Sequence, residues 1–241
     1  MTNLEDLTPT GELRAAINLG NPVLAGGTPA EPAGVTVDLA REIAARLGVP
    51  VRFSCFDAAR KSYQAMAAGD ADICFLAVEP AREADVAFTP PYVLIEGVFA
   101  VPVDSALTTV ADVDRDGVRI GVNRGSAYDL FLTRTLAHAT LVRGDEGVDV
   151  FREQGLEAAA GIRQPMTAYV AAHPDVRLVD EAFMTIRQAV GTRRDRRPAT
   201  VRFLAATVEE LKASGFVADA LRRSGQSPTL VAPAASLDST A

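Results

Sequence analysis

The sequence predicts an α/β protein in which mostly parallel strands form a sheet flanked by helices. Residues 72–78 form a short apolar run, as expected of a strand covered on both faces of a parallel sheet. Residues 37–47 predict an amphipathic helix, because apolar side chains recur every four positions. Strand and helix patterns of this kind alternate along the chain, which is typical of right-handed βαβ crossovers.

The first part of the chain predicts a complete βαβαβ unit. Its first two strands are expected over residues 13–19 and 51–56, and Gly48 ends the helix between them. Asp57 is expected to cap the helix that follows the second strand. The strand over 72–78 then completes the unit, and Pro80 stops it because proline has no backbone donor.

The last third of the chain predicts a mixture of short strands and helices. We expect a short strand over 176–179, a longer strand over 183–191 and a solvated arginine-rich loop over 193–197. Helical patterns follow over 199–213 and 215–223.

Length and composition narrow the function classes. The 241 residues allow one large domain or two lobes, and the formal net charge of -7 argues against a nucleic-acid partner. A pocket can still be locally positive. We find no run of 18 apolar residues, so we expect no membrane insertion.

Cysteine and histidine are too sparse to suggest a cofactor or metal site. Cys55 and Cys74 lie in apolar strand patterns, and the histidines are His138 and His173. The glycine-rich loops that bind nucleotides are absent from the sequence. We therefore expect no cofactor and no metal.

Arg82 is the first candidate binding residue, because it follows the predicted strand over 72–78. Ligands of open α/β sheets bind outside the carboxyl ends of strands. A guanidinium there could hold a carboxylate through two parallel hydrogen bonds. The alternative is a surface arginine that pairs with Glu79 or Glu83.

Asn18 and Asn21 are further candidates at the end of the first strand. Their amides could line the same cleft as Arg82. The alternative is that Asn21 and Pro22 only form a turn.

Gly125 and Ser126 form the second candidate site. They lie between a predicted strand over 117–122 and a predicted helix over 128–136. Ser126 stands at the N-cap position, where free N–H groups and the helix dipole attract anions. Gly125 would let a ligand approach the backbone closely. The alternative is a plain strand-to-helix turn.

Two stretches resemble a known family. Residues 72–92 read DICFLAVEPAREADVAFTPPY and residues 34–49 read GVTVDLAREIAARLGV. They resemble the family 3 extracytoplasmic solute-binding proteins, the amino-acid-type binding subunits of ABC importers. The resemblance implies that Arg82 grips the carboxylate of the ligand, and that Gly125 and Ser126 close on it. Residues 89–92 are expected to turn the chain into a new segment.

The resemblance also implies the type II periplasmic-binding-protein fold, in which two lobes close around a ligand through two hinge crossovers. Lobe 1 would comprise residues 11–98 and 190–225, and lobe 2 would comprise 99–189. The tail over 226–241 is rich in proline, alanine and serine, so we expect it to be unstructured.

The sequence departs from the family at the ligand's ammonium partner. The resemblance places an acid at about residue 162, where this chain has isoleucine, and hydroxyl residues near Ala77. An ammonium buried without a partner is costly. We therefore expect the ligand to be a small organic anion, a carboxylate that is not a standard α-amino acid. Arg163 could add a second positive group, which would favour a dicarboxylate or a keto acid.

Two further residues complete the candidate site. Glu96 interrupts an apolar strand over 93–101, so it should face the cleft or pair with an arginine. Gln188 could reach the cleft from the strand over 183–191.

We therefore expect a non-catalytic binding protein with an ABC permease as partner if it is exported. The resemblance implies a periplasmic location, but the N-terminal residues lack a signal-peptide pattern, which leaves the cytoplasm open. The alternative is an enzyme on the same fold, such as a cyclohexadienyl dehydratase-like protein or a menaquinone-pathway lyase. Glu96 and Glu157 are the acids that such an enzyme could use.

Overall fold

The computed structural model describes residues 5–235, and its contacts divide the chain into two compact units. Unit 1 combines Met1–Leu94 with Arg187–Ala241, and unit 2 is Ile95–Ile186. The chain therefore passes from one unit to the other twice. Our boundaries for the two lobes lie within a few residues of these points, and the lobes themselves stay a prediction.

Unit 1 is built on the βαβαβ unit that the sequence predicts. Its strands β1 (Leu13–Asn18), β4 (Val51–Phe56) and β5 (Ile73–Ala77) are parallel, with β1 in the middle. The C-terminal part of β10 (Val176–Arg193) pairs with β5 in the antiparallel direction. All five residues of β5 are buried, as its continuous apolar run predicts.

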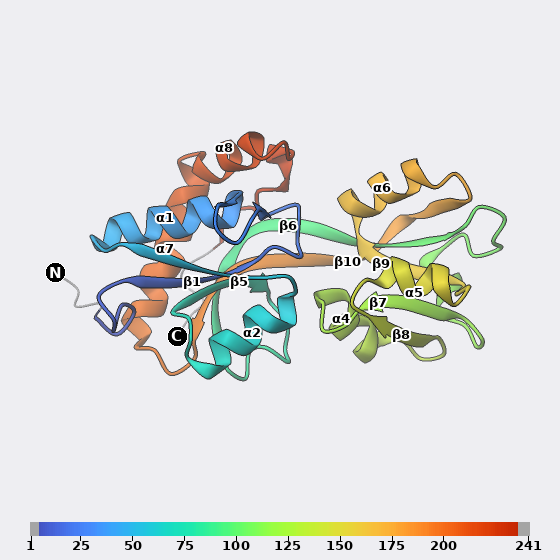
Figure 1. Ribbon diagram of the computed structural model, residues 1–241, viewed down its shortest axis with the longest axis horizontal. Helices are drawn as coiled ribbons and strands as arrows, with labels where there is room; N and C mark the ends of the chain where they lie inside the picture. The colour runs from blue at the N-terminus through green and yellow to red at the C-terminus, as the bar shows by residue number, and fades with distance from the viewer. Residues whose placement is uncertain (1–4, 236–241) are drawn as a thin grey trace. The chain divides into compact units, whose positions relative to one another are not determined.

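Helices cover both faces of these strands (Figure 1). The chain moves from β1 outward to β4 and then back past β1 to β5, so right-handed crossovers place α1 (Val35–Leu47) and α2 (Ala59–Ala68) on opposite faces. Buried side chains from β1, β5 and α2 pack into one apolar cluster on the α2 side. The remaining elements of unit 1 are β2 (Gly26–Gly27), β3 (Pro32–Ala33), α7 (Pro198–Ala213), α8 (Phe216–Arg223) and the 3-10 helix η1 (Pro228–Leu230).

Unit 2 has its own strands and its own core. Strand β7 (Arg119–Asn123) pairs in parallel with β8 (Thr140–Gly144) and β9 (Ala158–Ile162), and β9 pairs antiparallel with the C-terminal part of β6 (Val86–Pro102). The buried core comprises Val98, Ala100, Phe151, Leu156, Ala159, Met166 and Val176. The helices are α3 (Val110–Val113), α4 (Ala127–Thr135), α5 (Gly147–Glu153) and α6 (Arg163–Ala172).

The expected turn at residues 89–92 is wrong, because β6 continues through them. A proline ring fixes φ near −65°, which an extended strand tolerates where the missing N–H needs no partner. The carbonyl of Pro91 is still used, since it accepts a hydrogen bond from Lys212 Nζ at 3.1 Å.

The two strands expected over 176–179 and 183–191 form one long strand, β10. The loop that follows is also less solvated than we expected. Arg196 Nη2 donates to Asp72 Oδ1 at 2.9 Å, and Arg14 donates to the same carboxylate at 2.8 Å. Asp72 has no exposed side-chain surface, so it needs charged partners, and these fix Arg196 in place.

The C-terminal segment is docked on unit 1 as far as the structure describes it. Val231 forms a β-bridge with Val93, and the Ala232 N–H donates to the Tyr92 carbonyl at 3.0 Å. The expectation of an unstructured tail is therefore wrong for residues 226–235, and residues 236–241 lie outside the described residues.

The N-cap of α2 differs from the one that we expected. It is Ala58 and not Asp57, and the Asp57 carboxylate instead pairs with Lys61, one turn later, at 2.7 Å. Among the described helices, none is long and apolar enough to cross a membrane.

Candidate functional site

Arg82 lies in a tight turn that directly follows β5. Its N–H donates to the Glu79 carbonyl at 2.8 Å, and its carbonyl accepts from the Val86 N–H at 3.0 Å. Asp85 connects this turn to helix α2 and to the residue that follows β10. Tyr63 of α2 donates to the Asp85 carboxylate, and the Arg194 N–H donates to the backbone carbonyl of Asp85 at 2.8 Å.

The Arg82 side chain is buried, with 2 % of its surface exposed. Its Nη1 donates to the Ala77 carbonyl at 3.0 Å, so the guanidinium bends back over the end of β5. Burial lowers the pKa of Arg82 to about 10, and the nearby Glu79 opposes this effect. The group therefore keeps its charge at neutral pH. The expected alternative of an arginine exposed on the surface is wrong.

Glu79 is the acid that accompanies Arg82. It is 3 % exposed and lies three residues before Arg82 in the same turn. A carboxylate is buried at acceptable cost only where a positive charge is near. Glu79 and Arg82 thus form one buried group of opposite charges.

Ala77 and Gln188 lie beside this group. They are register partners in the β5–β10 pair, and Gln188 is 6 % exposed. The structure therefore brings three of the predicted residues, Ala77, Arg82 and Gln188, to the same end of the unit 1 sheet.

Asn18 and Asn21 use their amide oxygens locally. Asn18 Oδ1 accepts from the Gly20 N–H at 3.1 Å, and Asn21 Oδ1 accepts from the Val23 N–H at 3.3 Å. These are the contacts of a turn, as the alternative interpretation of this segment predicts. They leave the amide nitrogens for other contacts.

In unit 2, Ser126 is the N-cap of α4, as predicted. Its Oγ accepts from the Asp129 N–H at 3.1 Å. The Gly125 N–H donates to Asp129 Oδ2 at 2.8 Å, and Gly125 has a φ of 70°, where glycine is favoured. We expected a ligand anion to accept hydrogen bonds at the start of α4. The Gly125 N–H there already donates to Asp129, an acid of α4 itself.

Asp129 is 3 % exposed and also pairs with Arg143 at 2.9 Å. The sequence analysis missed it. The signal was present, because a serine followed three residues later by an acid is the pattern of a capped helix start. We had considered only the serine.

Glu96 and Arg163 form an ion pair within unit 2. Arg163 Nη2 also donates to the Asp180 carbonyl at 3.0 Å. The expectation that Glu96 pairs with an arginine is confirmed. The same pair neutralises Arg163, which we had considered as a second positive group for the ligand.

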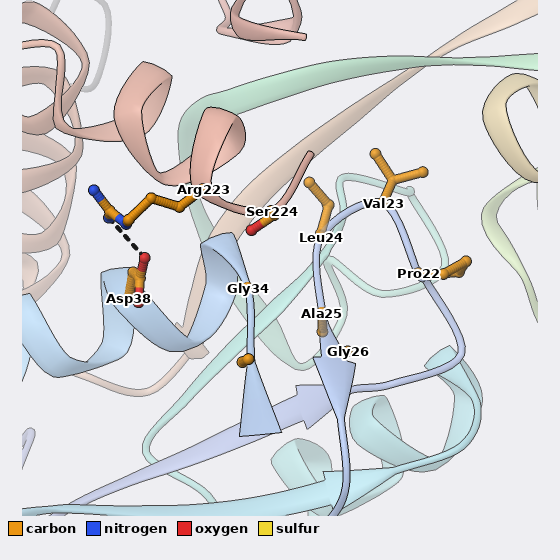
Figure 2. Close-up of a pocket in the computed structure, with 10 residues that line it drawn as sticks. Pro22, Val23, Leu24, Ala25, Gly26, Gly34, Asp38, Arg223 and Ser224 are labelled. Atoms are coloured by element: carbon orange, nitrogen blue, oxygen red, sulfur yellow. Dashed lines mark hydrogen bonds and ion pairs between the residues drawn. The ribbon is translucent and has the colours of Figure 1, made fainter. Parts of the chain in front are cut away.

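A separate pocket of about 360 Å³ lies in unit 1 between the start of α1 and the end of α8 (Figure 2). The charged residues in its lining are Asp38 and Arg223, which pair with each other at 2.7 Å. The predicted site residues do not line this pocket. Asp38 lies in the first turn of α1, where the helix dipole favours an acid.

The sequence profile of the bacterial extracellular solute-binding proteins, family 3, matches residues 15–225. The chain belongs to this family. The resemblance seen in the two sequence stretches is thereby confirmed over most of the chain. The search of curated proteins finds no match.

Solved structures of solute-binding proteins share the fold. An amino acid ABC transporter substrate-binding protein, AbpA from Streptococcus pneumoniae bound to L-arginine, has a TM-score of 0.74 at 20% identity, covering 92% of this chain and 99% of that chain. Holo ArgBP from T. maritima has a TM-score of 0.70 at 22% identity, covering 87% and 94%. The predicted α/β fold of the periplasmic-binding-protein type is confirmed.

A third similar structure is the ancestral amino acid-binding protein AncCDT-1, described as a precursor of cyclohexadienyl dehydratase. Its TM-score is 0.73 at 21% identity, covering 91% of this chain and 98% of that chain. At these identities the likeness to solved structures shows the fold alone. Membership of the solute-binding family rests on the profile match.

Proposed function

We propose that this family 3 solute-binding protein binds a small solute through its carboxylate, that Arg82 is the anchor, and that an ABC permease is the partner. The single observation that carries the anchor is the buried guanidinium at the end of β5, which keeps its charge in a dry setting. A charge-assisted hydrogen bond contributes about 1.5–3 kcal/mol, and more where water is excluded.

We propose only that the solute has a carboxylate, and we leave open whether it also has an ammonium group. Our expectation of a solute without an ammonium group rests on Ile162 and on the lack of hydroxyl residues near Ala77. The dicarboxylate or keto acid in addition needed Arg163 as a second positive group, and Arg163 is paired with Glu96. Similar solved proteins carry L-arginine or lysine, which argues against that expectation. The contacts of Gly125 and Ser126 with the solute's carboxylate stay predictions.

The test is calorimetric titration of the protein with the common L-amino acids, 2-hydroxy acids, keto acids and dicarboxylates. We expect at least one to bind, and Arg82→Ala to weaken that binding about ten- to hundredfold, as loss of one or two charge-assisted bonds predicts. Arg82→Lys keeps the charge but loses the two-pronged contact, so it should bind with intermediate affinity.

Arg202→Ala, at an exposed arginine of α7, is the matched control and should bind like the wild type. Thermal unfolding checks that each variant is folded. If the wild type binds none of these solutes, or if folded Arg82→Ala and Arg82→Lys both bind as the wild type does, the proposal fails.

The enzyme alternative draws support from the similarity to AncCDT-1. The two acids that we considered for it are both held in ion pairs, Glu96 with Arg163 and Glu157 with Arg119. The hydrogen bond from Arg119 lowers the pKa of Glu157, which is opposite to what a general acid needs at neutral pH. Incubation with prephenate or arogenate, followed by detection of phenylpyruvate, tests this alternative directly.

A further inference from the structure

Strand β6 carries the chain from unit 1 into unit 2. Its residues up to Leu94 belong to unit 1, and those from Ile95 onwards belong to unit 2. On one edge its neighbour is β10, the strand through which the chain returns. The other edge needs partners of its own, because an open strand edge leaves backbone N–H and C=O groups unpaired.

In unit 1, the C-terminal segment is the partner on this other edge. Val231 forms a β-bridge with Val93, and the Ala232 N–H donates to the Tyr92 carbonyl at 3.0 Å. Ala232, Tyr92 and Val93 are all buried. The segment therefore holds β6 until one residue before the end of its unit 1 part.

In unit 2, strand β9 takes over the same edge of β6. It pairs with residues 97–100. Residues 94–96 lie between the C-terminal segment and β9, and they include the boundary between the units.

The returning strand β10 is held in a similar way. Strand β5 pairs with its residues 188–192, and the Val78 N–H donates to the Arg187 carbonyl at 2.9 Å. Arg187 is the first residue of unit 1 on the return. Unit 1 thus holds both crossing strands almost to the boundary, β10 through β5 and β6 through the C-terminal segment.

The two holds differ in strength. Strand β5 is buried and pairs with β10 along its whole length. The C-terminal segment has one β-bridge and one backbone hydrogen bond to β6, and it depends on α7, where Lys212 Nζ donates to the Pro233 carbonyl at 2.8 Å. The hold on β6 is therefore the one that a small change can release.

We infer that residues 226–235 form a brace, which fixes β6 to unit 1 as far as residue 93 and confines bending of this crossover to residues 94–96. The brace is a conformational device, because the number of residues that can bend sets how many conformations the crossover has.

The brace acts on solute binding through the closure of two lobes that the family resemblance implies, and this part rests on the proposed function. A longer flexible crossover gives the solute-free protein more conformations, and a solute that stabilises one of them has to overcome that entropy. Release of the brace should therefore weaken binding although no residue of the proposed anchor is changed.

The test replaces Ala232 by proline, which removes the N–H that donates to the Tyr92 carbonyl. Val231 has a ψ of 127°, in the range favoured before proline. In the solute-free protein, the amides of residues 94–96 should exchange their hydrogens about tenfold faster in Ala232→Pro than in the wild type. The amides of residues 98–99, within the β9 pairing, should be unchanged.

Ala234→Pro is the matched control, because it introduces the same residue in the same segment, at an exposed position whose N–H donates to no described residue. It should leave the exchange as in the wild type. Lys212→Met is a second variant, since it releases the segment from α7 and should speed the same amides. Thermal unfolding verifies that each variant is folded, and Lys212→Met decides if Ala232→Pro does not fold.

Calorimetry with the solutes of the preceding titration measures the effect on binding. We expect about three- to tenfold weaker binding in Ala232→Pro and wild-type binding in Ala234→Pro. Equal exchange of residues 94–96 in the wild type and in the folded variants refutes the brace. Faster exchange with unchanged binding refutes its effect on the solute and leaves Arg82 as the anchor. If the wild type binds no solute, the proposed function fails, and the exchange alone decides on the brace.

Discussion

At the scale of single residues, an arginine or backbone N–H that the sequence suggests as a ligand contact can already be paired with an acid of the protein itself. Arg163 was expected to attract an anion, and it pairs with Glu96. The Gly125 N–H was expected to meet a ligand carboxylate, and it meets Asp129. Neither group is therefore a vacant positive site of the kind that the sequence suggests.

Glu157 gives a residue-scale prediction on pH. Its carboxylate accepts from the Arg119 N–H at 2.8 Å and from Arg119 Nε at 2.9 Å, and the hydrogen bond from the side chain is the main cause of its lowered pKa. Because the folded pKa lies below the unfolded one, the pair stabilises the protein above the ordinary glutamate pKa and loses its effect as the pH falls.

We therefore expect Glu157→Gln to lower the free energy of unfolding at pH 7 by less than about 1 kcal/mol, since both side chains are more than one third exposed. The difference between wild type and variant should shrink towards pH 3. Urea unfolding at both pH values measures it, and a difference that grows at low pH would contradict the assignment.

At the scale of elements, helix α7 holds the C-terminal segment against β6. Lys212 is almost fully buried, and its Nζ donates to the carbonyls of Pro91 at 3.1 Å and Pro233 at 2.8 Å and to Glu209 at 2.6 Å. Glu209 in turn accepts from the Ala235 N–H at 3.0 Å. One buried lysine therefore joins a helix, a strand and the segment after η1.

Replacing this lysine should loosen the C-terminal segment. We expect Lys212→Met to lower the free energy of unfolding by about 3 kcal/mol, because it removes the positive partner of the largely covered Glu209 carboxylate and the donor to two carbonyls. The amide of Ala232, which donates to the Tyr92 carbonyl, should exchange its hydrogen faster. Urea unfolding and hydrogen exchange measure both effects.

Lys61→Met, at the exposed lysine that pairs with Asp57 on α2, is the control and should change stability by less than about 1 kcal/mol. Equal effects of the two substitutions would show that the buried contacts of Lys212 add nothing.

At the scale of the whole molecule, the two units differ in how the chain builds them. Unit 2 is one continuous piece, Ile95–Ile186, whereas unit 1 needs segments from both ends of the chain. The core of unit 2 is made by its own residues, and its strand pairs β6–β9, β7–β9 and β7–β8 are internal.

We predict that residues 95–186 fold on their own, because a continuous segment with an internal core and internal strand pairs has what an independent domain needs. The isolated segment should show a cooperative urea transition and the circular dichroism of a mixed α/β protein. Segment 1–94 alone should lack such a transition, since β5 would lose its partner β10. A non-cooperative transition for 95–186 would contradict the prediction.

Much of the fold was predictable from local patterns. The buried run at 72–78 and the period of the helix at 37–47 each report on a few neighbouring residues, and both elements were placed within two residues of their bounds. The long strand β10 was divided in two, because exposed residues over 180–182 interrupt its apolar pattern while its backbone stays extended. The strand end before Arg82 and the helix start at Ser126 were also predicted, because both can be read locally. The binding roles of these two residues stay predictions.

The sequence by itself determined the alternation of strands and helices and the family, because these depend on the order of side chains along short stretches. Only the tertiary structure decided which acid each cation meets. Asp72 lies between Arg14 and Arg196, residues from distant parts of the chain that packing alone brings together. Burial then makes such pairs matter, since a charge without a partner is costly only where water is excluded.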